Sequence, residues 1–255
     1  MRGVYGRLER RNRGLSMKGR KQPATLVLCA TAPRQGLTGR SRAWLDAVRG
    51  VAVPVTWAVG IDTLAEVAGQ KDALDLALDI PPAACGSRGR LRELILRGRD
   101  LVPDLAAVVL RGPTPAANRG VLVEEGIRVA VVDAFEEEGR GNRRPAPKGW
   151  ACRNPIWGLW EVRVTPSRPA GLAGWLGLGG MPRLVPGGLH LLRTDGLSVG
   201  NNGSAFVSPR MERWIAWAVQ RRFQGTVSVV PLSTLPRLIA GTDREAVGRS
   251  VLRAA

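Results

Sequence analysis

From Pro23 onward, short runs of apolar and largely β-branched residues alternate with stretches in which apolar residues recur every three or four positions. The short runs are typical of buried strands, and the longer period is typical of amphipathic helices. The pattern predicts strands over residues 25–29, 51–59, 73–78, 106–110, 128–132, 160–164, 188–192 and 226–230. It predicts helices over residues 41–48, 61–68, 90–99, 116–125, 209–223 and 233–240.

Local signals support two helix boundaries. Ser208 precedes Pro209, and a hydroxyl cap followed by proline in the first turn favours a helix start. Gly126 follows the helix over 116–125, where a glycine in the left-handed conformation commonly ends a helix. The sequence predicts an exposed loop that leaves the barrel over residues 136–147 and a polar loop over residues 194–208. Residues 169–180 form an apolar, glycine-rich stretch of the sequence.

Strands that alternate with helices predict a parallel sheet with crossover helices, and therefore an α/β protein. About seven parallel strands fit a distorted (β/α) barrel, with an open doubly wound sheet as the rival fold. The strands carry neither a Gly-x-Gly-x-x-Gly turn nor a Gly-Lys-Ser/Thr loop, which argues against dinucleotide binding and P-loop chemistry. We expect residues 1–22 to form a disordered basic arm and residues 23–255 to form a single barrel domain.

The net charge of +17 raises nucleic acid as a partner. Residues 1–22 contain eight basic residues and one acid, so the arm is the expected contact. Against this, 34 of the 38 basic residues are arginine, a skew that GC-rich coding also produces, and a solvated arginine-rich surface is the alternative.

Composition also bears on the compartment. No apolar run reaches the roughly 18 residues of a membrane span, and no signal-peptide pattern begins the chain. The three cysteines, Cys29, Cys85 and Cys152, form no Cys-x-x-Cys pair. Reduced thiols and a cytoplasmic location are therefore expected.

Polar residues gather where the predicted strands end. They are Thr31, Asp79, Arg111, Asp133, Arg193 and Asp195. A (β/α) barrel places its working groups at this edge. The candidate catalytic residues are Asp79, Arg111 and Asp133. The candidate ligand-binding residues are Thr31, Trp57, Arg111, Trp157, Trp160 and Arg193.

Each candidate also has a plainer interpretation. Arg111 either holds an aspartate or ligand group or forms a salt bridge at the barrel mouth. Trp157 and Trp160 either offer aromatic faces to sugar rings or pack in the core. The single histidine of the chain, His190, lies in an apolar strand, which favours a buried structural role with hydrogen-bonded nitrogens.

Several segments between residues 24 and 240 resemble the polysaccharide deacetylase family, whose NodB-type fold is a distorted (β/α) barrel. Residues 54–60, Pro-Val-Thr-Trp-Ala-Val-Gly, resemble its second strand. Residues 110–113, Leu-Arg-Gly-Pro, are similar to its Phe-Arg-Pro-Pro motif, and a helix and residues 125–127 follow as in the family. Residues 189–195 resemble its late Leu-His-Asp strand, and residues 227–235 its closing strand.

The differences fall on the residues that carry the family's chemistry. Its first strand ends in Thr-Phe-Asp-Asp-Gly, which supplies a catalytic base and a metal ligand, whereas Ala30 and Thr31 stand here. Its His-x-x-x-His metal pair matches residues 79–83, where Asp79 is the only ligand type. Its late catalytic histidine matches Arg193, and His190 lies three residues earlier, on the opposite side of the strand.

Only Arg111 keeps the family's residue type at a functional position. The resemblance therefore implies a divergent deacetylase-like protein without metal-dependent deacetylase activity and without a cofactor, which binds a glycan or a protein partner. Two alternatives stay open. One is an active carbohydrate N-deacetylase or amidohydrolase rebuilt around Asp79, Asp133 and Arg111, which would need a divalent metal. The other is a basic nucleic-acid-associated protein.

Overall fold

The computed structural model describes residues 22–32, 51–69, 74–133, 151–165, 181–199 and 205–240. Four predicted segments lie outside these residues: the basic arm up to residue 21, the helix over 41–48, the exposed loop over 136–147 and the stretch over 169–180. They remain predictions.

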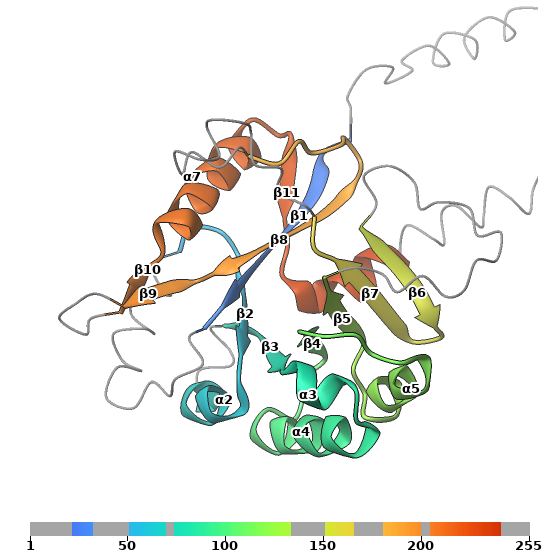
Figure 1. The fold of residues 1–255 in the computed structure, drawn as a ribbon. Coiled ribbons are helices and arrows are strands. Elements are labelled where there is room, and N and C mark those ends of the chain that lie inside the picture. The colour runs from blue at the N-terminus through green and yellow to red at the C-terminus, as the bar shows by residue number, and fades with distance from the viewer. Residues whose placement is uncertain are drawn as a thin grey trace, which may run out of the picture.

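One sheet forms the centre of the molecule, and eight of its nine strands run parallel (Figure 1). The parallel strands are β1 (Ala24–Thr31), β2 (Thr56–Val59), β3 (Asp75–Ile80), β4 (Ala107–Leu110), β5 (Val129–Val132), β7 (Leu159–Arg163), β8 (Leu189–Asp195) and β11 (Val227–Val229). The antiparallel strand is β6 (Cys152–Ile156), which forms a hairpin with β7. From β1 the sheet continues through β2, β3, β4 and β5 to this hairpin.

Strand β1 has three parallel partners. Strand β8 pairs along one side of β1 over Thr25–Thr31. On the other side, β11 pairs with the first half of β1 and β2 pairs with the second half. The backbone N–H groups of Ala151 and Thr165, on either side of the β6–β7 hairpin, donate to Leu189 O at 3.1 Å and Leu191 O at 2.7 Å of β8. The sheet therefore curls back towards its own start, and the predicted distorted barrel is confirmed.

Side-chain alternation along the strands separates two apolar clusters. In β1, Leu26 and Leu28 belong to the outer cluster beneath the helices, whereas Val27 and Cys29 belong to the inner cluster. Leu232 and Leu235, which follow β11, complete the inner cluster. Two hydrogen bonds hold this segment against β2 and β3, because Leu232 N donates at 2.9 Å both to Thr56 Oγ1 and to an Asp75 carboxylate oxygen.

The helices lie against the outer face of the sheet (Figure 1). They are α2 (Ile61–Val67), α3 (Pro82–Cys85), α4 (Arg88–Leu101), α5 (Ala116–Glu124) and α7 (Pro209–Phe223), and a 3-10 turn covers Leu232–Thr234. The cap before α7 is confirmed, since Ser208 Oγ accepts a hydrogen bond from Met211 N at 3.2 Å. Gly126, after α5, has a φ of 75°, as predicted.

One ion-pair network is buried between α5 and the sheet. Arg119 Nε of α5 donates to Glu161 Oε1 of β7 at 2.8 Å, and Arg153 Nε of β6 donates to Glu161 Oε2 at 2.7 Å. The Glu161 side chain is 1% exposed and the Arg119 side chain 5%. Both oxygens of this carboxylate are therefore satisfied out of contact with water.

Three local predictions are wrong. Strand β6 was not predicted, because Arg153, Asn154 and Pro155 give it a polar sequence, which an antiparallel strand at the sheet edge tolerates. The polar loop predicted over 194–208 contains a two-stranded hairpin of β9 (Leu197–Val199) and β10 (Ala205–Val207). The second strand begins at Thr56 and not at residue 51.

Within the described residues, no helix is both long enough and apolar enough to span a bilayer. The three cysteines are buried and form no disulfide.

Candidate functional site

Four predicted site residues come together at the carboxyl ends of the strands, and we call them the mouth cluster: Asp79, Arg111, Asp133 and Arg193. Each follows an inner-cluster residue by two positions, namely Ala77, Val109, Val131 and Leu191. Because side chains alternate along a strand, all four are directed to the inside of the barrel.

Arg111 and Asp79 form a two-point ion pair between neighbouring strands β4 and β3. Arg111 Nε donates to Asp79 Oδ1 at 2.6 Å, and Nη2 donates to Oδ2 at 3.1 Å. Burial lowers the pKa of Arg111, but the hydrogen bond and negative charge of Asp79 raise it more, so the net pKa lies above its usual value. Arg111 is therefore a fixed cation, and the salt-bridge interpretation of this residue agrees with the geometry.

Arg193 of β8 forms the second ion pair through Nη2 with Asp133 Oδ1, beyond the end of β5. The Asp133 side chain is 57% exposed, while the Arg193 side chain is largely buried. Arg193 Nη1 is buried as well, and no described residue accepts a hydrogen bond from it. An unsatisfied buried guanidinium donor is costly, which marks this atom as a place for a ligand oxygen.

Cys29 lies on the inner face of β1 close to the mouth cluster, and sequence reasoning missed it. Burial raises the pKa of the Cys29 thiol to about 12, although the charges of Arg193 and Arg111 lower it in part. The thiol is therefore protonated at neutral pH and is a poor nucleophile. Both faces of β1 are buried, so its continuous apolar run gave no signal of the side on which Cys29 lies.

Thr31 and Asp195 form a separate polar contact where β1 and β8 end. Thr31 Oγ1 lies 3.1 Å from Thr194 O and 3.3 Å from Asp195 Oδ1. Ser208 Oγ donates to Asp195 O at 2.6 Å. Thr31 is buried, and its hydroxyl already has these internal partners. Its main role in this geometry is therefore to hold the two strand ends together.

The predicted aromatic ligand contacts do not join the mouth cluster. Trp57 is 1% exposed and belongs to the outer cluster, because its neighbours Thr56 and Ala58 take the inward positions. Trp157 is 92% exposed at the turn between β6 and β7. Trp160 pairs with Val129 at the start of β5, near the amino ends of the strands.

His190 lies on the face of β8 opposite to Arg193. It is buried, its Nε2 accepts a hydrogen bond from Val185 N at 3.0 Å, and burial lowers its pKa. The geometry fits the expected structural role of a neutral, hydrogen-bonded histidine.

The donor set of the mouth does not fit the divalent metal that the deacetylase resemblance implies. Asp79 and Asp133 each accept from a guanidinium, and the two cations would repel a third positive charge. Across the described residues, no group of three or more His, Cys, Asp and Glu side chains is arranged to hold a metal ion.

Comparisons with known proteins bear on the fold. No protein-family model and no curated protein matches the chain. The crystal structure of a Mycobacterium smegmatis protein, provisionally assigned as a polysaccharide deacetylase, superposes with a TM-score of 0.54 at 12% identity, covering 88% of this chain and 92% of that one. A family 4 carbohydrate esterase from Streptomyces lividans, in complex with acetate, gives a TM-score of 0.35 at 17% identity, covering 43% of this chain and 62% of that one. The first likeness shows a deacetylase-like fold, and the second is too low to support a conclusion.

Proposed function

We propose that this chain is a divergent protein of the deacetylase-like fold whose mouth binds a glycan without metal-dependent deacetylation. The observation that carries the proposal is the state of the mouth cluster: both carboxylates are held by arginines, and no acceptor among the described residues reaches Arg193 Nη1. The fold likeness supports the class of ligand, and the side chains support binding over hydrolysis.

Hydrolysis at this site lacks suitable groups. Both carboxylate oxygens of Asp79, the candidate base, already accept hydrogen bonds from Arg111. Cys29 is protonated, and Thr31 has internal hydrogen-bond partners. Metal-assisted hydrolysis needs about three protein ligands around an open position, which two arginine-paired aspartates do not supply.

Binding of hydroxyl groups suits the same side chains. A sugar hydroxyl both donates and accepts hydrogen bonds, and an arginine–carboxylate pair presents donors and acceptors side by side. Arg193 Nη1 supplies a donor, and the exposed carboxylate of Asp133 supplies acceptors next to it. The ion pairs also fix both side chains before a ligand arrives, which lowers the entropy lost on binding.

The test combines binding and activity on the full chain. Calorimetric titration with N-acetyl chito-oligosaccharides should show saturable binding that Arg193→Gln weakens about tenfold or more, because a charge-assisted hydrogen bond is lost. Arg97→Gln, which changes an exposed arginine of α4, is the matched control. Acetate release should stay at background with and without added divalent metal.

Three results would overturn the proposal. Metal-dependent acetate release that Asp79→Asn abolishes would establish the rebuilt amidohydrolase instead. Absence of binding to any oligosaccharide would remove the glycan ligand. DNA binding with a steep salt dependence that disappears on removal of residues 1–22 would favour the nucleic-acid interpretation.

A further inference from the structure

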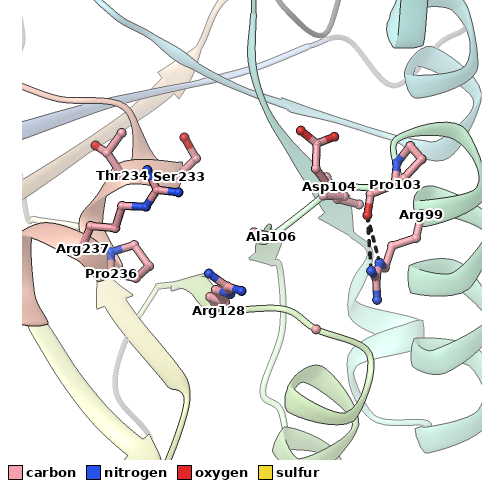
Figure 2. Close-up of a pocket in the computed structure, with 11 residues that line it drawn as sticks. Arg99, Pro103, Asp104, Ala106, Arg128, Ser233, Thr234, Pro236 and Arg237 are labelled. Carbon is pink, nitrogen blue, oxygen red and sulfur yellow. Dashed lines mark hydrogen bonds between the residues drawn. The ribbon is translucent and has the colours of Figure 1, made fainter.

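A second site lies at the amino ends of strands β4 and β5, away from the mouth cluster. It is a cavity of about 390 Å³ whose lining includes Arg99, Asp104, Arg128, Ser233, Thr234 and Arg237, and we call it the basal pocket (Figure 2). We propose that the basal pocket binds the phosphoryl group of a small organic phosphate. This inference does not depend on the proposed glycan site.

The three arginines reach the basal pocket from separate parts of the chain. Arg99 comes from α4, Arg128 directly precedes β5, and Arg237 follows the 3-10 turn Leu232–Thr234. Figure 2 shows them bordering the pocket at the right, lower centre and left. Segments far apart in sequence therefore place three cations on the lining of one pocket, where all three would attract an anionic ligand.

Arg99 is the fixed member of the set. Its Nη1 donates to Glu125 O at 3.0 Å, and its Nη2 lies 3.3 Å from Pro103 O. Gly126 makes this position accessible, because a Cβ at Gly126 would lie 2.9 Å from Arg99 Nη1. The Arg99 charge is therefore held at the wall of the pocket.

Arg128 and Arg237 are exposed, and within the described part of the chain neither guanidinium forms a hydrogen bond or an ion pair. Among the described residues of the lining, Asp104 is the single carboxylate. Three cations facing one anion leave an excess of positive charge. Guanidinium groups match the oxygens of a phosphoryl group in charge and in geometry.

The hydroxyl group of Ser233 adds a hydrogen-bond donor to the rim of the basal pocket. Thr234 Oγ1 donates to Pro231 O at 2.9 Å, which stiffens the turn that carries Ser233. The turn is also fixed through the two hydrogen bonds of Leu232 N described above. The Ser233 side chain therefore borders the pocket from a rigid segment and adds a donor for a phosphate oxygen.

The size of the pocket indicates an organic phosphate. Its volume falls in the range of small-molecule sites and equals roughly a dozen water molecules at about 30 Å³ each. An inorganic phosphate would occupy only part of this space. The remainder accepts an uncharged organic portion.

Titrations of the full chain by calorimetry or NMR test the proposal, with glucose 6-phosphate, inorganic phosphate and glucose as probes. Glucose 6-phosphate should bind saturably, inorganic phosphate more weakly, and glucose not at this site. Arg128→Gln and Arg237→Gln should each weaken glucose 6-phosphate binding about tenfold, because each removes a charge-assisted hydrogen bond. Asp104→Asn should tighten it severalfold, because it removes the opposing carboxylate.

The controls separate a built site from general attraction to a basic protein. Arg97→Gln removes an exposed arginine of the same helix as Arg99 but outside the pocket, and should leave binding unchanged. Equal weakening by Arg97→Gln, or no saturation at millimolar glucose 6-phosphate, would overturn the proposal. Equal affinities for inorganic phosphate and glucose 6-phosphate would overturn the organic portion of the ligand. Stronger binding of duplex DNA, weakened by the same two substitutions, would assign the pocket to a polymer.

Discussion

Glu161 offers a sharp test of how burial controls the energetics of charge in this protein. The substitution Glu161→Gln keeps the size of the side chain and removes the negative charge shared by Arg119 and Arg153. Because the carboxylate is 1% exposed and Arg119 5%, the arginine left behind has little access to water. Removing one partner of such a buried pair costs about 3–5 kcal/mol.

Urea unfolding followed by tryptophan fluorescence measures this cost. With a slope of about 2–3 kcal/mol per molar urea, the midpoint should fall by about 1–2 M. The chain contains a matched control, since Glu124 of α5 is also contacted by two arginines, Arg88 at 3.0 Å and Arg92. That cluster is exposed, with the Glu124 side chain at 47%, so Glu124→Gln should cost less than about 1 kcal/mol.

Two further measurements would show whether the stability cost comes from burial of the charge. Equal midpoint shifts for Glu161→Gln and Glu124→Gln would refute the assignment of the cost to burial. The double substitution Arg119→Met with Glu161→Leu should recover most of the stability, because apolar side chains replace a buried ion pair at little net cost. A double variant as unstable as Glu161→Gln would show that the loss comes from packing and not from the removal of the Glu161 charge.

Three further predictions concern buried groups. The Cys29 thiol, with a pKa of about 12, should resist iodoacetamide at pH 8 until urea unfolds the chain; rapid modification of native protein at this residue would contradict its burial. Gly196→Ala should destabilise the protein by about 1–3 kcal/mol, because the new Cβ would overlap the Trp57 ring. Gly89→Ala enters open space and should cause no loss in the same urea titration. Because burial lowers the pKa of His190 in the folded state, the unfolded chain binds more protons below about pH 6.5, so the free energy of unfolding should decline from pH 7 to 5. The substitution His190→Gln should flatten that decline. The same decline in the variant would refute the assignment of the pH dependence to His190.

The mouth cluster was predictable as a set because a strand has a period of two residues. Once Asp79, Arg111 and Asp133 are placed at parallel strand ends, one edge of the sheet must contain all of them. Their partners were not predictable. Arg111 pairs with Asp79 because β3 and β4 are neighbours, and Arg193 reaches Asp133 only because the sheet curls.

The positions of Trp57 and Glu161 could not be predicted from the sequence. Both faces of a barrel strand are covered, so an apolar sequence does not tell which side of β2 Trp57 occupies. Glu161 is a stronger case, since a glutamate between Trp160 and Val162 reads as a solvated position. Its burial depends on Arg119, which lies 42 residues earlier and is brought to it by the packing of α5.

The three partners of β1 have a consequence for how the chain acquires its structure during synthesis. Ala24 pairs with Val227 and Thr25 pairs with Leu189, so most of the hydrogen bonds of this strand await segments that are synthesised much later than the strand itself. Until then only β2 is present to pair with the second half of β1. Contacts so distant in sequence slow folding and leave apolar edges exposed to other chains. On the ribosome, β1 therefore emerges long before two of its three partner strands are available to pair with it.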